Sequence, residues 1–287
     1  MSIKIVTDST ANLPKEIIKE YGIEIIPLKV TLGVNEYRDG IDIAPAQFYE
    51  LLRTTKLFPK TSPPTVGEFL QTYRKLIREG AKEIISFHLS EKLSETVKAA
   101  REAAGMIPDA KITVIDSKSC TMGLGFLPLN AARMVRAGES GEKILEWVEA
   151  TIPRIKAVFT ATTLEYLERG GRLGKAQTFL GSILDLKPIL IMQLGHGEIE
   201  PIIRVRGLDS ATEKIAQIAA EHIENLGEAK GIAILHTSMP KEANALMDKI
   251  WHYRIKGEIK VVELFMDELS IVLGSHMGPW AYGVCIY

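Results

Sequence analysis

The stretch Ile3-Lys4-Ile5-Val6-Thr7-Asp8-Ser9-Thr10 is a short apolar run that ends in an acidic and hydroxyl-bearing turn. Its isoleucines and valine are residue types that favour strands. Similar runs recur along the chain, and they alternate with longer segments in which apolar residues follow the helical period. This alternation is typical of α/β proteins with a mainly parallel sheet, so we predict an α/β fold.

The predicted strands are short and lie between turn residues. In the first half they cover residues 3–7, 23–32, 83–88 and 111–115. In the second half they cover residues 157–161, 189–193, 200–205, 231–236, 260–264 and 281–287.

Helix starts are predicted from two kinds of signal. Thr65-Val66-Gly67-Glu68 and Ser210-Ala211-Thr212-Glu213 have the pattern of a capping box, in which a hydroxyl and a glutamate bind free amides reciprocally. Pro14, Pro45 and Pro240 lie just inside other predicted starts, where an N–H is not needed. Further helices are predicted over residues 94–105, 121–137, 140–152 and 174–184.

The pattern of elements changes near residue 155. Before it the chain is a regular succession of strands and helices, and after it two consecutive strands with a turn at Gly195-His196-Gly197 precede two further strand-helix units. We therefore predict two domains. Residues 1–155 form a Rossmann-like domain with a mainly parallel sheet and flanking helices, and residues 156–287 form a smaller α/β domain.

Composition excludes several classes of protein. The chain has 287 residues, a net charge of −1, 46% hydrophobic and 25% charged residues, which is typical of a globular protein. A charge near zero does not favour nucleic-acid binding. No run approaches the ~18 uncharged apolar residues that span a membrane, and the N-terminus does not have the pattern of a signal peptide. We expect a cytoplasmic protein without integral membrane association.

Motifs for cofactors and metals are not found in the sequence. Cys120 and Cys285 have no CxxC spacing, so neither a disulfide framework nor a zinc site is predicted. Gly174-Lys175 lacks the first glycine and the hydroxyl of a P-loop, and Gly123-Leu124-Gly125 does not complete a dinucleotide fingerprint. The H-E-x-x-H and G-x-S-x-G motifs do not occur. No cofactor and no metal are expected.

Two hydroxyl-bearing turns are candidate binding sites for an anion. Thr61 and Ser62 precede two prolines and the helix that begins at Thr65, and Ser94 follows the strand at 83–88 and opens a helix. Hydroxyl donors beside the positive end of a helix suit a carboxylate or a phosphate. Two such turns at one edge of a sheet predict a single crevice, although turns of this kind also occur for structural reasons alone.

Two further side chains are candidates on looser grounds. Arg172 follows a glycine pair that ends a predicted helix, and a guanidinium there suits an anion or an exposed salt bridge. His276 lies on a glycine-rich turn before the last strand, where it is either a site residue or a surface histidine. Asp8 and Ser9 are candidates for the ligand crevice or for a helix cap.

Taken in order, these turns resemble the DegV family of bacterial lipid-binding proteins. The resemblance is collinear and covers essentially the whole chain. It rests on these stretches: Thr7-Asp8-Ser9-Thr10-Ala11-Asn12-Leu13-Pro14, Thr61-Ser62-Pro63-Pro64-Thr65, Leu93-Ser94-Glu95-Thr96, Asp116-Ser117, Tyr166-Leu167-Glu168-Arg169-Gly170-Gly171-Arg172, Lys187-Pro188-Ile189 and His276-Met277-Gly278-Pro279.

The resemblance implies a two-domain protein that holds one long-chain fatty acid, such as palmitate, stearate or oleate, in a tunnel between its domains without catalysis. It implies that the hydroxyls of Thr61 and Ser94 meet the carboxylate, with Ser62 in the same turn and with His276 and Arg172 near the head group. Residues 1–155 then carry the head-group turns and residues 156–287 cover the tail. A separate fatty acid kinase is the implied partner, and it would phosphorylate the carboxylate.

Three positions depart from the family pattern. Glu95 replaces a usual glycine, so its carboxylate would repel the head group unless it points away. Trp280 replaces another small residue, and its bulk is expected to shorten or redirect the pocket. Val97 replaces a usual tyrosine. The sequence predicts neither the preferred chain length and unsaturation nor the oligomeric state.

Two other functions stay open at this point. One is an enzyme, either a hydrolase with Ser94 as nucleophile and His276 as base or a phosphotransfer protein that uses the hydroxyl turns. The other is a regulatory or scaffold module in which Arg204-Val205-Arg206 forms a small basic contact.

Overall fold

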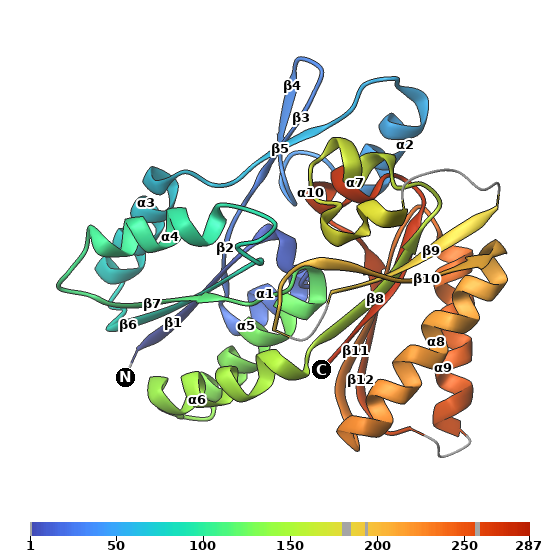
Figure 1. The fold of residues 1–287 in the computed structure, drawn as a ribbon. Helices are drawn as coiled ribbons and strands as arrows, with labels where there is room; N and C mark the ends of the chain where they lie inside the picture. Colours follow the sequence, from blue (N-terminus) through green and yellow to red (C-terminus); the bar gives the residue numbers. More distant parts are fainter. Residues whose placement is uncertain (1, 180–184, 193–194, 256–258) are drawn as a thin grey trace.

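The computed structural model describes residues 2–179, 185–192, 195–255 and 259–287 (Figure 1). Within these residues the strands form three sheets, and helices flank the two larger ones. The α/β class predicted from the sequence is confirmed. None of the described helices combines the length and the apolar composition needed to cross a lipid bilayer.

The first sheet has the strand order β2-β1-β6-β7, and all its described pairs are parallel. The packing of α3 and α4 against one face buries Val6, Phe69 and Ala100. Helices α1, α5 and α6 lie on the opposite face (Figure 1). The elements are β1 (Ile3–Asp8), β2 (Glu24–Ile26), β6 (Glu83–His88), β7 (Lys111–Asp116), α1 (Lys15–Tyr21), α3 (Val66–Arg78), α4 (Thr96–Gly105), α5 (Thr121–Arg136) and α6 (Gly141–Thr151).

The second sheet is larger and mixed, with the order β10-β9-β8-β13-β11-β12 in the described part of the chain. Only β11 and β12 pair in parallel there, and the other pairs are antiparallel. Helices α8 and α9 cover one face (Figure 1). The elements are β8 (Lys156–Ala161), β9 (Leu186–Met192), β10 (Ile199–Arg206), β11 (Ala229–Thr237), β12 (Val261–Glu268), β13 (Ala281–Ile286), α8 (Gly207–Leu226) and α9 (Pro240–Ile255).

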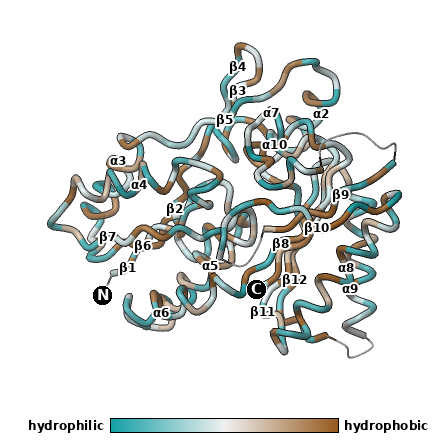
Figure 2. Tube along the Cα trace, viewed as in Figure 1, coloured by the Kyte–Doolittle hydropathy of each residue, from teal (hydrophilic) through white to brown (hydrophobic). Residues whose placement is uncertain are grey.

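The opposite face of the second sheet turns toward α5 and shares one hydrophobic core with it. Phe126 of α5 packs against Tyr287, with ring centroids 4.6 Å apart. Figure 2 shows hydrophobic residues concentrated along the strands of this sheet. Helix α5 also packs closely on the segment that follows β1, because Gly125 has no side chain: a Cβ there would lie 2.3 Å from the carbonyl oxygen of Ala11. The glycines of residues 123–125 therefore serve packing.

A small third sheet, β4-β3-β5, was not predicted. It consists of β3 (Lys29–Leu32), β4 (Asn35–Arg38) and β5 (Lys60–Ser62), and it lies near α2 (Pro45–Thr54), α7 (Glu165–Arg169) and α10 (Ile271–Met277) (Figure 1). The single strand predicted over residues 23–32 is wrong, because the chain leaves the first sheet at Pro27, which has no N–H to donate. Strands of three or four residues give too little periodicity to be recognised.

The predicted helix starts are partly correct. Thr65 forms the predicted capping box, in which its hydroxyl accepts from the Glu68 amide at 3.2 Å and the Glu68 carboxylate accepts from the Thr65 amide at 2.7 Å. Pro45 and Pro240 begin their helices, whereas Pro14 precedes α1 by one residue. The start predicted at Ser210 is wrong. Helix α8 already begins at Gly207, directly after β10.

The remaining short helices correct two predictions. Residues Gly174–Phe179 form the 3-10 helix η3, whereas the prediction was one helix over 174–184; residues 180–184 lie outside the described residues, as does Gln193. Asp8 caps η1 (Ser9–Ala11) by accepting from the Thr10 amide at 3.0 Å. Another 3-10 turn, η2 (Ile152–Arg154), leads into β8.

Candidate functional site

A cavity of about 340 Å³ lies between the inner face of the second sheet and the turns that leave the first sheet. This volume is in the range of about 300–1,000 Å³ that small-molecule sites usually have. Strands β8 and β13 form one wall, and α10, β5 and the start of α5 form others. The wall is mostly apolar, and its polar groups are Thr61, Ser62, Ser94, Glu95, Thr121, Arg172 and His276.

Thr61 and His276 meet at this cavity, although 215 positions separate them in the sequence. Thr61 lies on β5, which an antiparallel pairing with β3 holds extended. His276 lies in the last turn of α10, and its Nε2 is 2.8 Å from Oγ1 of Thr61. The turn predicted around His276 is wrong, because Ser270 caps a helix over Ile271–Met277. The structure thus brings two of the predicted site residues into direct contact.

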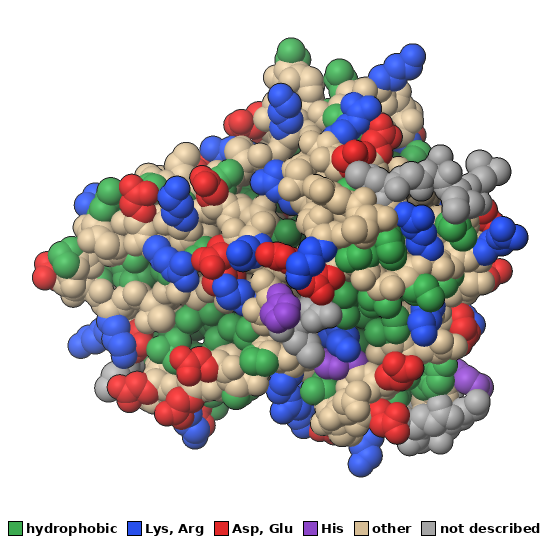
Figure 3. Space-filling model, viewed as in Figure 1, with side chains coloured by type: hydrophobic (Ala, Val, Ile, Leu, Met, Phe, Trp, Pro, Cys, Tyr) green, Lys and Arg blue, Asp and Glu red, His purple; other side chains and the backbone are tan. Residues whose placement is uncertain are grey.

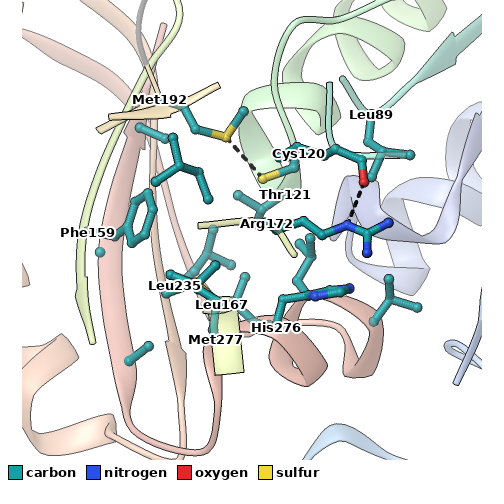
Figure 4. A pocket seen from close by; sticks show the side chains of 18 of the residues that line it. Leu89, Cys120, Thr121, Phe159, Leu167, Arg172, Met192, Leu235, His276 and Met277 are labelled. Atoms are coloured by element: carbon teal, nitrogen blue, oxygen red, sulfur yellow. Dashed lines mark hydrogen bonds between the residues drawn. The ribbon is translucent and has the colours of Figure 1, made fainter. Parts of the chain in front are cut away.

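Arg172 is held beside the same part of the cavity by backbone carbonyl groups. Its Nε donates to the carbonyl oxygen of Leu93 at 3.0 Å (Figure 4). Its Nη1 donates to the carbonyl oxygen of Gly170 at 2.5 Å. The first bond joins the loop after α7 to the turn that carries Ser94. Both of these partners are neutral carbonyl groups, so neither bond neutralises the positive charge of Arg172.

Ser94 lines the cavity at the entrance to α4. Its hydroxyl is 2.8 Å from that of Thr96, and it also accepts from the Thr96 amide at 3.3 Å. Helix α4 begins at Thr96, so Ser94 lies two residues before it rather than in it. The hydroxyl turns at Thr61 and Ser94 do open on one cavity, as the sequence predicted for a shared crevice.

Burial keeps His276 neutral. Removal from water, followed by the nearby positive charge of Arg172, lowers the pKa of His276 to about 4. An uncharged imidazole can exchange a hydrogen bond with Thr61 but contributes no cation near pH 7. Arg172 is then the cationic group in the polar part of the cavity wall that Thr61 and His276 form.

Two of the departures from the family pattern differ in their relation to the cavity, because Glu95 is among its lining residues and Trp280 is not. The Glu95 side chain is 77% exposed and lies 3.8 Å from Lys98. It therefore points away, as a residue at the start of a helix can. Trp280 is 42% exposed and is not among the lining residues, so the expectation that its bulk shortens the pocket is wrong.

The hydrolase interpretation requires a serine next to a base that a third group orients. His276 is bonded to Thr61, and Ser94 is bonded to Thr96. In the part of the chain that is described, Nδ1 of His276 has no hydrogen-bond partner. The structure therefore does not assemble a Ser94 and His276 pair.

The apolar wall contains several sulfur atoms, whose proximity no sequence pattern predicted. Sγ of Cys120 lies 3.4 Å from Sδ of Met192 (Figure 4). Cys285 and Met277 also line the cavity. Burial raises the pKa of Cys285 to about 12 and the pKa of Cys120 further, so both remain thiols. The expectation that both cysteines act as small hydrophobic side chains agrees with these positions.

The basic stretch 204–206 lies at the end of β10. Arg204 stacks on the ring of Phe179, 4.7 Å from its centroid. Figure 3 shows positive and negative side chains interspersed over the face in view rather than a basic field. Residues 204–206 are the last residues of β10 and lie where this strand ends.

The comparisons with known proteins agree with this geometry. A family model described as that of uncharacterised proteins of the DegV family matches residues 2–287. A DegV domain-containing protein of Caldanaerobacter subterraneus is 35% identical over 285 residues, which are 98% of this chain and 97% of the relative. The protein DegV of Bacillus subtilis is 32% identical over 286 residues, 99% of each.

Solved structures are similar over the full length. A DegV family protein from Thermus thermophilus, described by its fatty acid binding, has a TM-score of 0.92, 34% identity, and coverage of 100% of this chain and 99% of that one. The fatty-acid-binding DegV of B. subtilis has a TM-score of 0.85 and 31% identity, with the same coverage. A stearic-acid-binding protein from Eubacterium ventriosum has a TM-score of 0.87 and 28% identity, with coverage of 100% and 98%. This chain belongs to the DegV family.

Proposed function

We propose that this protein binds one long-chain fatty acid, such as palmitate, stearate or oleate, and does not itself transform it. The carboxylate lies at Thr61 and Ser94, with Ser62, Arg172 and His276 around it. Residues 1–155 supply the hydroxyl turns, and residues 156–287 cover most of the acyl tail as a second domain.

The observation that carries this proposal is the division of the cavity wall. Its hydroxyls, its guanidinium and its imidazole come from Thr61, Ser94, Arg172 and His276, whereas β8, β13 and α10 contribute apolar side chains. A fatty acid has the same division into one anionic group and a long apolar tail. Neutral hydroxyl donors and one guanidinium satisfy a carboxylate without a fully buried cation.

The apolar wall supplies the larger part of the expected affinity. Burial of a saturated tail contributes roughly 0.8 kcal/mol per methylene, or on the order of 10 kcal/mol for a long chain before the costs of ordering are subtracted. The head-group contacts then fix the orientation of the ligand. The described relatives that bind stearic acid and other fatty acids support this assignment.

We further propose that the bound acid is presented to a separate fatty acid kinase in the cytoplasm. Thr61, Ser94 and Arg172 are half-buried rather than sealed, so the head group lies near the surface. A carboxylate held by hydroxyls at such a place is accessible to a second protein, while the tail stays covered.

The first test is to denature protein purified from a bacterial host, extract it and quantify acyl chains by mass spectrometry. We expect about one fatty acid per chain in the wild type and much less in the double variant Thr61→Val, Ser94→Ala. A folded, monodisperse wild type without an acyl chain would contradict the proposal. Turnover of acyl esters or acyl phosphates that disappears in Ser94→Ala would favour an enzyme instead.

A further inference from the structure

The floor of the cavity is a face of the second sheet whose side chains are mostly small. Ala281, Gly283 and Cys285 are alternate residues of β13 and therefore share one face, the face on which Cys285 belongs to the core with Ala157. Their partners on β8 are Ala161, Phe159 and Ala157, in that order. These pairs form three rows across the floor. The first row, nearest α10, pairs Ala281 with Ala161, and the last row pairs Cys285 with Ala157, so both rows consist of small residues.

Phe159 interrupts this floor in its middle row. It lies directly opposite Gly283, and a Cβ on Gly283 would come within 2.4 Å of the Cβ of Phe159. A glycine inside a strand is typical of a place where another group approaches the backbone closely. Here that group is the phenylalanine, which is half-buried although β8 lies inside the sheet. Figure 4 shows its ring at the cavity.

The order along β13 places Phe159 partway down the tail. His276 and Met277 end α10, and Ala281 follows them on β13. Because two residues of a strand advance about 7 Å, Gly283 lies one step farther from the head group than Ala281, and Cys285 lies one step beyond that. A straight chain that followed β13 would meet the Phe159 ring at the second step.

Beyond Phe159 the wall is built from adaptable groups. Cys285 and Ala157 form the last row of the floor, and Met192 pairs with Ala157 on the adjacent strand. Cys120 touches Met192 from the side of α5. Methionine is flexible and fills irregular space, so this end can receive a chain that arrives at an angle.

We propose that Phe159, lying across Gly283, makes the acyl channel bend partway along the tail, so that a cis-monounsaturated chain binds in preference to a straight one of equal length. This inference rests on the proposed function. A saturated chain prefers extended staggered torsions and bends only by leaving them, whereas a cis double bond supplies the bend within the covalent structure. Phe159 is thus a specificity-determining residue outside the head-group site.

The test compares three 18-carbon probes: octadecanoate, cis-9-octadecenoate and trans-9-octadecenoate. The trans probe has the same double bond as the cis probe but an extended shape, so it separates shape from the polarisability of the double bond. Delipidated wild type, Phe159→Ala and Phe159→Leu are titrated with each probe. Leu190→Ala is the matched control, because Leu190 pairs with Phe159 in the same row but does not line the cavity.

We expect wild type and Leu190→Ala to bind the cis probe about tenfold more tightly than the other two, a ratio that differences in apolar packing can supply. In Phe159→Ala the ratio should fall below about threefold, with Phe159→Leu between. If Phe159→Ala does not fold, Phe159→Leu is sufficient as a test, because its preference for the cis probe should also be smaller than that of wild type.

Three results would overturn the inference: octadecanoate binding as tightly as the cis probe in wild type, the trans probe binding as tightly as the cis probe, or a preference that survives both substitutions. Each leaves fatty acid binding intact. Failure of delipidated wild type to bind any probe would instead overturn the proposed function, and this inference with it.

Discussion

Two histidines of this protein have similar partners and opposite surroundings. His88 lies on β6, and its Nδ1 is 3.0 Å from an Asp8 carboxylate oxygen while its Nε2 is 2.8 Å from the Ser86 hydroxyl. His276 lies on α10 and contacts Thr61, and its Nδ1 has no partner in the described residues. The serine, histidine and aspartate set is the more complete one, yet it is fully buried. Whether a ligand can reach the histidine therefore distinguishes a binding site from a structural network better than the residue types do.

The His88 network holds the first sheet together and supports the cavity from behind. The Tyr73 hydroxyl donates to Ser86 at 2.9 Å, and the ring of Phe69 packs edge-on against His88. Asp8 also accepts from the Leu89 amide at 3.0 Å. Since Leu89 lines the cavity and begins the turn that leads to Ser94, the buried network fixes one side of the site.

The largest expected effect is on stability and comes from the buried side of this comparison. Asp8→Ala removes the acceptor of the Thr10 and Leu89 amides and the partner of His88, so these buried groups lose their hydrogen bonds. We expect a loss of at least about 3 kcal/mol in the free energy of unfolding. Urea unfolding of the ligand-free protein measures it.

Asp8→Asn is the control for shape, and it should lose less because its amide oxygen can still accept. Fatty acid stoichiometry at low temperature should remain near that of wild type for any variant that stays folded. An Asp8→Ala protein as stable as wild type would mean that the network has no structural role.

The next effect is on affinity and comes from the cavity side. Thr61→Val removes a hydroxyl from the polar part of the wall and changes little volume. We expect the dissociation constant for a long-chain fatty acid to rise about 10- to 100-fold, as for loss of a hydrogen bond to a charged group. Isothermal titration of delipidated protein measures it.

Thr61→Ser keeps the hydroxyl and should bind within about threefold of wild type. The ligand-free stability of Thr61→Val should stay close to that of wild type, in contrast to Asp8→Ala. An unchanged dissociation constant in Thr61→Val would place the carboxylate elsewhere.

Apart from β2, the sequence predicted the strands of both large sheets because each has an apolar run. It also predicted the Thr65 capping box, whose partners are three residues apart. The Ser210 start failed although its pattern is equally good, because the chain turns into α8 immediately after β10 and helical residues precede the serine. A local pattern predicts a cap only when the preceding residues are free to stay outside the helix.

The polar candidates that line the cavity were predicted one by one, but the contact between Thr61 and His276 was not. Thr61 and His276 meet only because β5 pairs with β3 while α10 packs against both α7 and the small sheet. None of these arrangements is visible as periodicity. The position of Phe159 opposite Gly283 depends on an antiparallel register between strands more than 120 residues apart, so it could not be predicted locally either.

A third effect uses pH to test the burial of His276. The folded pKa of His276 is about 4, below the value of about 6.5 for an exposed histidine, so its contribution to stability is present above pH 6.5 and is lost as pH falls toward 4. We expect the His276→Gln variant to lose less stability than wild type over this interval. Between pH 6.5 and about pH 5 the difference should be on the order of 1–2 kcal/mol.

The measurement is chemical unfolding of ligand-free protein at several pH values. Burial also lowers the pKa of His222 and His236, but these groups are present in both proteins and cancel in the comparison. A parallel loss of stability in wild type and variant would mean that His276 already exchanges with water.

The smallest effect is expected at Glu95, which belongs to neither histidine's surroundings. Its side chain is 77% exposed and lies near Lys98, so water and salt screen it from the cavity. Glu95→Gln should change the dissociation constant for a fatty acid less than about twofold at ~0.15 M salt. Lys98→Gln is a matched control for loss of the ion pair alone. Fivefold tighter binding by Glu95→Gln would contradict this expectation. It would mean that the Glu95 carboxylate of the wild type turns toward the head group in the complex and weakens binding at a position where the family usually has glycine.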